Sequence, residues 1–548
     1  MSAVEFNLAL VHETISAAVP DRDCLVWRDR RFTYAEITDR SRRLSHVLHE
    51  SGLGVRTERS ALAGHESGQD HLALLLYNGN EYLEAMLGAY KARVVPFNVN
   101  YRYVEAELRY LFEDADVRGV VYHSAFAPVV DALRTGLPEA KLFLQVSDGS
   151  RNELLKGAIE YEAALRGASS EPLPVDPSPE DLYLIYTGGT TGMPKGVCWR
   201  QHDVFMAAMG GRTLGTSETV HSYEEVAARA ARGPGMRAMP LPPLMHAASQ
   251  WVSFITMAGG GTLVMQSDTE RLDPADVWRT IERERVQTVT VVGDAIVRPL
   301  LDELERGSYD TSSLLAIGNG GARLNPALKE RLLAALPSLY LTDSAGASET
   351  GAQMTHVSTP DAVSSGRFSP YPGTVVLAAD LARLAEAGHS DLGWLAQVGN
   401  VPLGYLGDKD KTARTFPVIN GVRYAVPGDR ARLLESGEIE LLGRESVTIN
   451  SGGEKIFAEE VEQALARHPD VYDVVVVGRP SERWGEEVVA LVCLRPGAGI
   501  DDAALVEAAA LHVARFKLPK AVVRVEEVRR TPVGKPDYRW ARERAARG

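Results

Sequence analysis

Short apolar runs alternate along the chain with segments whose apolar residues recur at helical spacing. Runs of the first kind occupy residues 94–97, 119–122, 141–144 and 261–264. Strands buried on both faces read as continuous apolar runs, so this alternation predicts mostly parallel sheets layered with helices. Three helix starts carry cap signals: Thr33 has a glutamate three residues later, and Asp273 and Asn325 each precede a proline.

The alternation is interrupted twice and then restarts near the C-terminus. Polar stretches at about 58–70 and 214–235 are expected to be surface insertions. After about residue 443 a compact pattern follows, with strands at 474–477 and 488–494 and helices near 459–467 and 503–515. The pattern predicts two domains, residues 1–443 and residues 444–548, the second of them small and α+β.

Composition narrows the class of protein. With 548 residues, 45% of them hydrophobic and 24% charged, the chain is too long for one core and too apolar for disorder. A net charge of -14 disfavours nucleic acid and anionic lipid as partners. The cysteines Cys24, Cys198 and Cys493 form no metal-binding or disulfide pattern, which suits a cytoplasmic location. No uncharged run approaches the length of a transmembrane segment, and the start lacks the pattern of a signal peptide.

The stretch with the strongest chemical signal is residues 181–196, where an apolar strand runs directly into a loop rich in glycine and threonine. Glycines let backbone N–H groups converge on an anion, while hydroxyls and a lysine add donors and charge. The residues of this kind are Thr187, Gly188, Gly189, Thr190, Thr191, Gly192 and Lys195. The proline before the lysine breaks the Walker A spacing. From these residues alone, a Gly/Thr-rich hairpin turn is the alternative to a phosphate site.

This loop resembles the signature of a known family. Residues 186–196 read YTGGTTGMPKG, which is similar to the YTSGTTGxPKG of adenylate-forming enzymes: acyl-CoA synthetases, firefly luciferase and the adenylation domains of peptide synthetases. The resemblance runs from residues 31–36 to the C-terminal lysine segment. It implies a large N-terminal domain of mostly parallel sheets layered with helices, a β-barrel-like subdomain, and a small mobile α+β C-terminal domain. It also implies that the loop holds the β- and γ-phosphates of ATP.

Two further segments resemble the parts of the family that surround the acyl group and the adenine. Residues 241–246 look like the segment whose histidine, here His246, borders the acyl pocket. Residues 318–324 are similar to the adenine-contacting GGAPL segment, which implies nucleotide contacts for Gly320, Gly321 and Ala322. A histidine among apolar residues is, taken alone, more often a packing residue.

Residues 343–351 resemble the YGxTE motif, with Ala345 in place of the tyrosine and Ser348 in place of the threonine. Glu349 then falls at the position that coordinates Mg²⁺ between the ATP phosphates, with Thr190 as the second expected ligand. A carboxylate beside a triphosphate needs a cation between them, since two anions in contact repel. Outside this context, a lone glutamate in a Gly/Ser loop is ordinarily just solvated.

The C-terminal motifs complete the resemblance. Asp429 and Arg444 match the residues that hold the ribose, and Val447 stands at the hinge, where a charged residue is usual. The family places a glycine-lined strand beside the CoA arm, here Gly452, Gly453 and Glu454, and a catalytic lysine near the end, here Lys535. A Gly-Lys in an exposed turn is, without these earlier matches, a common surface feature.

The resemblance therefore implies an AMP-forming acid–thiol ligase that uses ATP, CoA and Mg²⁺, with Lys535, Thr190 and Glu349 as catalytic residues. The acyl site is expected to include His246, Trp251, Gly318, Gly320 and Ala345. Small residues at these strand ends indicate either a roomy pocket or tight backbone packing. The chain looks most similar to actinobacterial fatty acyl-CoA synthetases, a branch that includes ligases for steroid side-chain acids, so a bulky or long-chain hydrophobic acid is expected.

Two other hypotheses stay open. An adenylating enzyme that loads a carrier protein would share every motif, and the departures at Gly188, Ala345, Pro427 and Val447 suit a catalytically weakened binding protein. Retention of the charged motif residues argues against the second, because unpaired charges are costly to keep. A homodimer is a candidate assembly.

Overall fold

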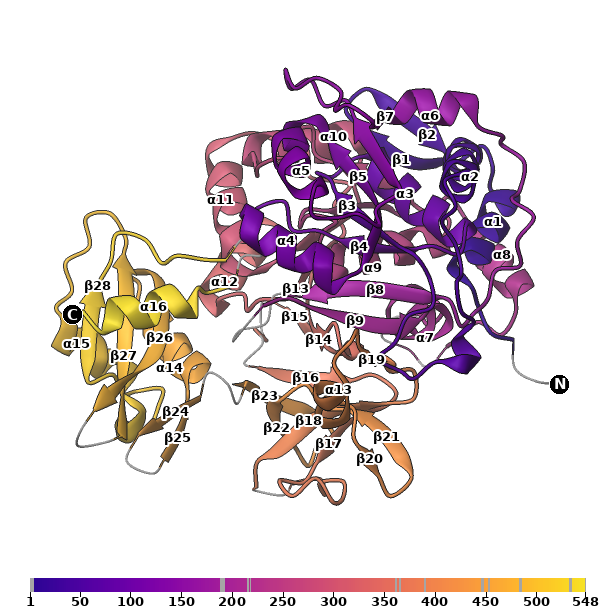
Figure 1. Cartoon of the computed structure of the whole chain (residues 1–548). Helices are drawn as coiled ribbons and strands as arrows, with labels where there is room; N and C mark the ends of the chain where they lie inside the picture. Colours follow the sequence, from indigo (N-terminus) through magenta and orange to yellow (C-terminus); the bar gives the residue numbers. More distant parts are fainter. Residues whose placement is uncertain are drawn as a thin grey trace.

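The computed structural model describes residues 4–187, 193–213, 216, 218–359, 362–363, 366–388, 391–444, 448–451, 454–481, 485–531 and 535–547. Figure 1 shows a large body of sheets and helices, with a smaller C-terminal body beside α11 (Gly293–Arg306) and α12 (Pro326–Ala335). We call the described residues from 448 onward the C-terminal module.

The first sheet is parallel throughout, as the apolar runs predicted. In spatial order its strands are β4 (Val95–Asn98), β3 (His71–Leu75), β5 (Val117–His123), β6 (Leu142–Val146) and β7 (Ile159–Glu160). The runs at 94–97, 119–122 and 141–144 therefore become β4, β5 and β6. Every residue of β3 and β4 is buried. The two faces of β3 pack into two different apolar clusters.

The second sheet changes character along its length. Its parallel part comprises β1 (Asp23–Trp27), β11 (Thr262–Met265), β10 (Arg237–Pro240), β12 (Thr288–Val291), β13 (Ala316–Gly320) and β14 (Tyr340–Ala347), with β2 (Arg30–Thr33) antiparallel at the edge. The antiparallel continuation comprises β15 (Gly351–Ser358), β16 (Arg367–Pro370), β23 (Ile439–Arg444), β22 (Asp429–Leu433), β18 (Gly393–Val398), β17 (Thr374–Leu377), β21 (Val422–Ala425) and β20 (Val418–Ile419). This continuation has a small core of its own around Met354, Phe368 and Leu395, and it is the β-barrel-like part that the resemblance implied.

Between the two sheets lies a short antiparallel one, made of β8 (Leu182–Thr187), β9 (Lys195–Arg200) and β19 (Gly404–Tyr405). The helices of the large body are α1 (Leu8–Ala18), α2 (Tyr34–Glu50), α3 (Asn80–Lys91), α4 (Glu105–Asp114), α5 (Ala127–Arg134), α6 (Tyr161–Gly167), α7 (Gln201–Ala208), α8 (Tyr223–Ala231), α9 (Ala247–Ala258), α10 (Pro274–Glu284), α11, α12 and α13 (Lys409–Thr415). All three predicted caps are confirmed: Thr33 forms a capping box, and Asp273 and Asn325 accept hydrogen bonds from the first-turn N–H groups of α10 and α12.

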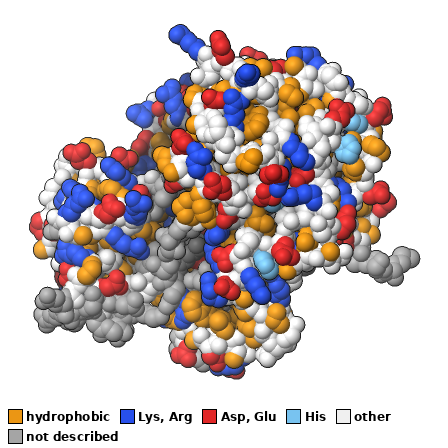
Figure 2. All heavy atoms as spheres, in the orientation of Figure 1, with side chains coloured by type: hydrophobic (Ala, Val, Ile, Leu, Met, Phe, Trp, Pro, Cys, Tyr) orange, Lys and Arg blue, Asp and Glu red, His pale blue; other side chains and the backbone are white. Residues whose placement is uncertain are grey.

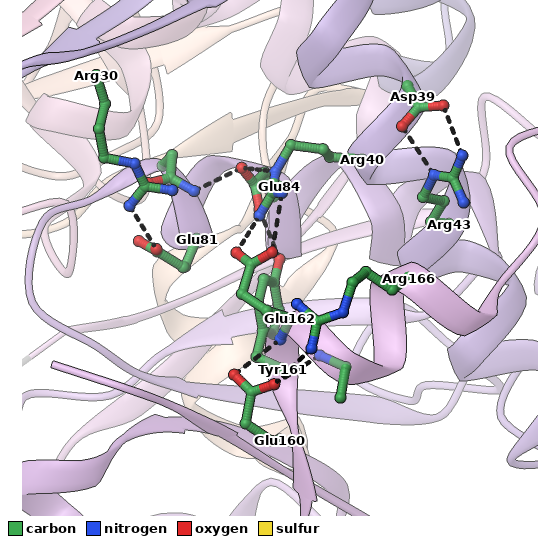
Figure 3. A network of polar contacts seen from close by, with 12 residues as sticks. Arg30, Asp39, Arg40, Arg43, Glu81, Glu84, Glu160, Tyr161, Glu162 and Arg166 are labelled. Atoms are coloured by element: carbon green, nitrogen blue, oxygen red, sulfur yellow. Dashed lines mark hydrogen bonds and ion pairs between the residues drawn. The ribbon is translucent and has the colours of Figure 1, made fainter.

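Helix α3 is buried along its whole length, which forces its charged residues into a polar network (Figure 3). Arg40 of α2 donates to both oxygens of Glu84 at 2.7 and 3.0 Å, and also to Glu162. Glu84 is completely buried and accepts further hydrogen bonds from Tyr161 and Asn80. A buried carboxylate is tolerated only with such partners, so this network ties α2, α3 and α6 together.

The two polar stretches expected as surface insertions lie mostly at the surface, but each is anchored by a few buried residues. Stretch 214–235 contains α8, which starts at a Ser222 cap and packs against α1 with Val226 and Ala230 buried. At the end of stretch 58–70, Gln69 is buried. Its side-chain amide donates a hydrogen bond to Arg93 O and accepts one from Leu182 N of β8. Tertiary contacts gave these polar segments structural roles that their composition does not reveal.

The C-terminal module is built on its own sheet of β25 (Glu454–Phe457), β24 (Thr448–Ser451), β27 (Gly485–Leu494), β26 (Val471–Ser481) and β28 (Ala521–Arg524). Its helices are α14 (Ala458–Ala466), α15 (Asp502–Ala509) and α16 (Tyr538–Ala545). Separate apolar clusters cover the two faces of the sheet. The helix expected over 503–515 ends six residues early, because a turn and a short 3-10 segment (Arg515–Lys517) follow.

On the face shown in Figure 2, basic and acidic side chains are interspersed rather than gathered by sign. None of the helices in the described ranges is long and apolar enough to cross a membrane.

Candidate active site

The strands that flank the predicted phosphate loop form a hairpin. Strands β8 and β9 pair with Thr187 opposite Lys195, while Gly188, Gly189, Thr190, Thr191 and Gly192 lie outside the described residues. Lys195 Nζ lies 3.5 Å from Asp114 Oδ1 and 3.9 Å from Asp408 Oδ2. Although partial burial opposes it, Tyr110 and these carboxylates raise the pKa of Lys195, so the lysine stays cationic beside the loop.

The expected metal ligand, Glu349, sits in the turn between β14 and β15. Tyr405 of β19 donates its hydroxyl hydrogen to Glu349 Oε1 at 2.7 Å, and Trp199 Nε1 donates to Ser348 O at 2.8 Å. The Nζ of Lys411 lies 4.0 Å from the centroid of the Tyr405 ring. Burial lowers the pKa of Lys411, and the charges of Glu349 and Lys195 both act on it. Lys411 therefore lies within electrostatic reach of both the Glu349 turn and Lys195.

The loop expected to contact adenine, residues 320–322, follows β13 and is held by the side-chain amide of Asn319. Asn319 accepts a hydrogen bond from Gly293 N and donates to Ala322 O and to Asp343 Oδ1. Gly321 follows with a φ of +78°, a conformation that favours glycine. These contacts fix Gly320, Gly321 and Ala322 at the carboxyl end of a parallel strand, where open α/β sheets bind ligands.

The glycines at this edge do not owe their size to crowding. A Cβ on Gly318 would meet Thr342 Oγ1 at 3.5 Å, and one on Gly320 would meet Ser344 O at 3.6 Å, both ordinary contacts. On Gly346 of the neighbouring strand, by contrast, a Cβ would lie 2.2 Å from Gly351 O. Tight packing therefore explains Gly346, whereas Gly318 and Gly320 have room for a Cβ at ordinary contact distance. Ala345 pairs with Met354 and packs against the barrel-like core.

The acyl-side segment places His246 directly before α9. Burial, together with the positive charges of Arg102 and Lys535, lowers the pKa of His246 to about 3, so the imidazole is neutral. Within the described ranges its Nε2 has no hydrogen-bond partner. Trp251, one turn into α9, packs against the large core. Lys535, on the C-terminal module, therefore lies within electrostatic reach of the segment expected to border the acyl group.

One buried amide joins the acyl and phosphate sides. Asn98 at the end of β4 exchanges hydrogen bonds with the backbone of Tyr186, at 2.7 and 2.9 Å, and donates to Met245 O at 2.7 Å. Tyr186 also donates its hydroxyl hydrogen to Asp114, the partner of Lys195. The strand entering the phosphate loop and the segment before His246 are thus held in fixed relation.

The ribose-side residues meet across two strands. Asp429 of β22 and Arg444 of β23 are backbone partners in the antiparallel register. Val447, Gly452 and Gly453 lie outside the described residues.

For Glu454 only the backbone, in β25, is described.

Sequence reasoning missed Asn98, Arg102, Asp114 and Tyr405. Each acts on a motif residue more than fifty positions away, as Tyr405 does on Glu349. No local spacing signals such a contact, because it arises only when strands from distant parts of the chain become neighbours.

Comparison with known proteins agrees with this geometry. Residues 13–389 match the family model of the AMP-binding enzyme, and residues 460–535 match that of the AMP-binding enzyme C-terminal domain. The chain belongs to the AMP-binding enzyme family.

Among its relatives, it is 56% identical to the medium-chain acyl-CoA ligase Mig of Mycobacterium avium over 99% of both chains. It is 40% identical to a medium/long-chain-fatty-acid–CoA/3-oxocholest-4-en-26-oate–CoA ligase of Mycobacterium tuberculosis, over 99% of this chain and 96% of the relative. An anthranilate CoA ligase crystallised with anthranoyl-AMP shares the fold, with a TM-score of 0.83 at 20% identity over 99% of this chain and 97% of that one.

Proposed function

We propose that this protein is an AMP-forming acyl-CoA synthetase that activates a medium-chain, long-chain or steroid side-chain carboxylic acid. The observation that supports the proposal is that the charge of Lys535 acts on His246, so the C-terminal lysine lies within electrostatic reach of the segment expected to border the acyl group. The names of the two relatives, one a medium-chain ligase and the other a fatty-acid and steroid-acid ligase, support the same substrate class.

A carboxylate must be activated before a thiol can displace its oxygen. In the proposed reaction the acid's oxygen attacks the α-phosphorus of ATP, pyrophosphate leaves, and an acyl-adenylate forms. The CoA thiolate then attacks the acyl carbon and AMP leaves, giving the thioester. Negative charge grows on phosphoryl oxygens in the first step, so Lys535, Lys195 and the loop hydroxyl of Thr190 would stabilise it electrostatically. No side-chain nucleophile is needed.

The donor set fits a Mg²⁺ ion that arrives with ATP. Glu349 offers a carboxylate held in place by the Tyr405 hydroxyl, and Thr190 would add a hydroxyl. Among the residues described, no group of three His, Cys, Asp or Glu side chains could cage a metal unaided, which suits an ion that takes its other ligands from phosphates and water. When bound, the ion supplies positive charge to the phosphates.

The acyl site is proposed to open at the end of β13. The space beside Gly318 and Gly320 favours the roomy pocket over the packing explanation, and His246, Trp251 and Ala345 complete the proposed set. A neutral His246 suits such a pocket, because a charged imidazole buried against the apolar acyl group would be unfavourable.

The ribose is proposed to lie across Asp429 and Arg444, and the CoA arm beside Gly452, Gly453 and Glu454. The C-terminal domain, residues 444–548, is proposed to rotate about Val447 between the two steps, because Lys535 serves only the first. A cytoplasmic location and a homodimer stay predictions from the sequence.

The test is release of pyrophosphate and AMP from Mg²⁺-ATP with short, medium, long-chain and steroidal acids, each with and without CoA. Pyrophosphate with medium, long or steroidal acids, and thioester only when CoA is present, is the expected result. Pyrophosphate without CoA-dependent turnover would indicate a carrier protein as the acceptor. Silence across the panel would refute the proposal and favour a binding protein.

A further inference from the structure

The C-terminal module meets the large body at a seam that contains a buried arginine. Arg298 of α11 is buried, and its Nη2 lies 3.2 Å from Asp294 Oδ2 on the same helix. On its other side the guanidinium carbon lies 4.2 Å from the ring centroid of Tyr472, in β26 of the module. A guanidinium stacked on an aromatic ring is attracted to it, more strongly when water is excluded. Arg298 therefore joins the two bodies.

A short path leads from this contact to Lys535. Asp473, next to Tyr472, accepts hydrogen bonds from Arg530 Nη2 at 2.7 and 2.9 Å and from Nε at 3.2 Å. Arg530 directly precedes Thr531, whose N–H donates to Lys535 O at 2.7 Å. The paired, mostly buried Arg530 therefore anchors this hydrogen bond to β26, so the position of β26 against α11 sets the position of Lys535.

A second arginine fastens the module from the nucleotide side. Arg323 directly follows the loop of residues 320–322, and its Nη1 donates to Glu459 O of α14 at 3.0 Å. With the Gln463 amide oxygen turned toward it, the same guanidinium gains bonds of 2.8 and 3.2 Å. It also reaches Leu441 O of β23 at 3.5 Å. In the GGAPL segment that this stretch resembles, proline stands at this position, so the arginine is a departure of this chain.

We propose that Arg298 and Arg323 are positioning residues for adenylate formation: they fasten the C-terminal module in the orientation that presents Lys535 to the acyl site. The inference rests on the proposed function. A side chain as long as lysine contributes to a transition state only when its backbone is held in place, and a misplacement of about 1 Å can cost about 100-fold. Thioester formation, which needs the rotated module, does not require the seam, because rigid-body switching exchanges one set of interface contacts for another.

The experiment compares the two half-reactions in Tyr472→Leu, Arg323→Ala and the double variant. Tyr472→Leu removes the stacking contact while leaving the Arg298–Asp294 pair intact. Arg331→Ala is the matched control, because Arg331 of α12 pairs only with Asp302 and Glu305 among the described residues, both on α11. Adenylation is measured as ATP–pyrophosphate exchange at saturating ATP, and thioester formation is measured from synthetic acyl-adenylate and CoA.

Each seam variant is expected to lower kcat for exchange about tenfold, and the double variant more, while thioester formation changes less than about twofold. Arg323→Lys should recover part of the loss. Equal losses in both half-reactions would mean that the seam is merely structural and would overturn the proposal, as would unchanged exchange.

A distance measurement keeps the inference separate from the activity. The three native cysteines are buried, so dyes can be placed through Glu139→Cys on the large body and Arg539→Cys on α16, both exposed positions. In the labelled protein with both seam contacts intact, energy transfer should report one dominant distance between the dyes. In the labelled protein that lacks both seam contacts, the distribution of distances should be broader. An identical distance distribution in the two labelled proteins would refute the role of the seam, even if no acid were activated. Broadening in a protein that activates no acid would refute only the proposed function.

Discussion

Filling the space beside Gly318 is the sharpest test of the acyl site. Gly318 lies in β13, where valine suits the strand conformation, and a Cβ there meets nothing closer than Thr342 Oγ1 at 3.5 Å. Gly318→Val adds three carbons, and the first of them fits at ordinary contact distance. If the acyl chain passes this wall, the added carbons occupy its volume.

The expected loss in kcat/KM follows from the free-energy cost of each carbon that no longer fits an apolar pocket. About 1 kcal/mol per carbon, the low end of the range for one methylene, amounts to about 3 kcal/mol for valine, or roughly 100-fold in kcat/KM. The loss should fall on long-chain and steroidal acids, whereas a short acid that does not reach Gly318 should change less than about threefold. The KM for ATP should stay unchanged, because the proposed nucleotide contacts begin at Gly320, beyond the substituted position.

The assay is kcat/KM across acids of increasing length, together with the melting temperature of each variant. Gly346→Ala is the matched control from the adjacent strand: its Cβ would lie 2.2 Å from Gly351 O, so it should lower the melting temperature and depress all acids alike. A uniform loss in Gly318→Val, or no loss for any acid at an unchanged melting temperature, would refute the placement of the acyl chain.

Three further predictions concern the catalytic lysine and the core. Lys535→Ala should lower pyrophosphate release about 100-fold or more while sparing thioester formation from supplied adenylate; equal losses would contradict the assigned role. Arg40→Ala should lower the free energy of unfolding by about 3–5 kcal/mol in urea titrations, because it leaves the buried Glu84 carboxylate without its cationic partner. Adding Glu84→Gln to the same chain should restore part of the lost stability. A loss under about 1 kcal/mol for Arg40→Ala would count against the network. Burial lowers the pKa of His12 from 6.5 to about 3, so the unfolded chain binds a proton that the folded chain does not, and stability falls as the pH drops from about 6.5 toward 3. His12→Leu should flatten this decline by up to about 1.4 kcal/mol per pH unit, and an unchanged slope would show that His12 is not the group responsible.

The sequence alone indicated the layered fold and the order of the motifs. Apolar runs became the parallel strands β4, β5 and β6, because burial of both faces leaves a direct mark on composition. Caps such as Thr33 were readable because their hydrogen bonds span three residues. The family resemblance was likewise legible, since its loops are contiguous stretches of chain.

Tertiary structure decided what surrounds those motifs. The sequence could not choose between a pocket and tight packing for the small residues, and the difference between Gly318 and Gly346 appears only when neighbouring strands are in place. Three contacts join residues far apart in the chain: the hydrogen bond from Tyr405 to Glu349, the hydrogen bond from Asn98 to Met245 O, and the stacking of Arg298 on Tyr472. The mostly exposed stretch 214–235 likewise contains α8, which buries Val226 and Ala230 where it packs against α1. Local sequence specifies elements through short-range bonds and periodicity, whereas contacts between elements depend on which surfaces the topology brings together, and no window of the sequence contains both partners.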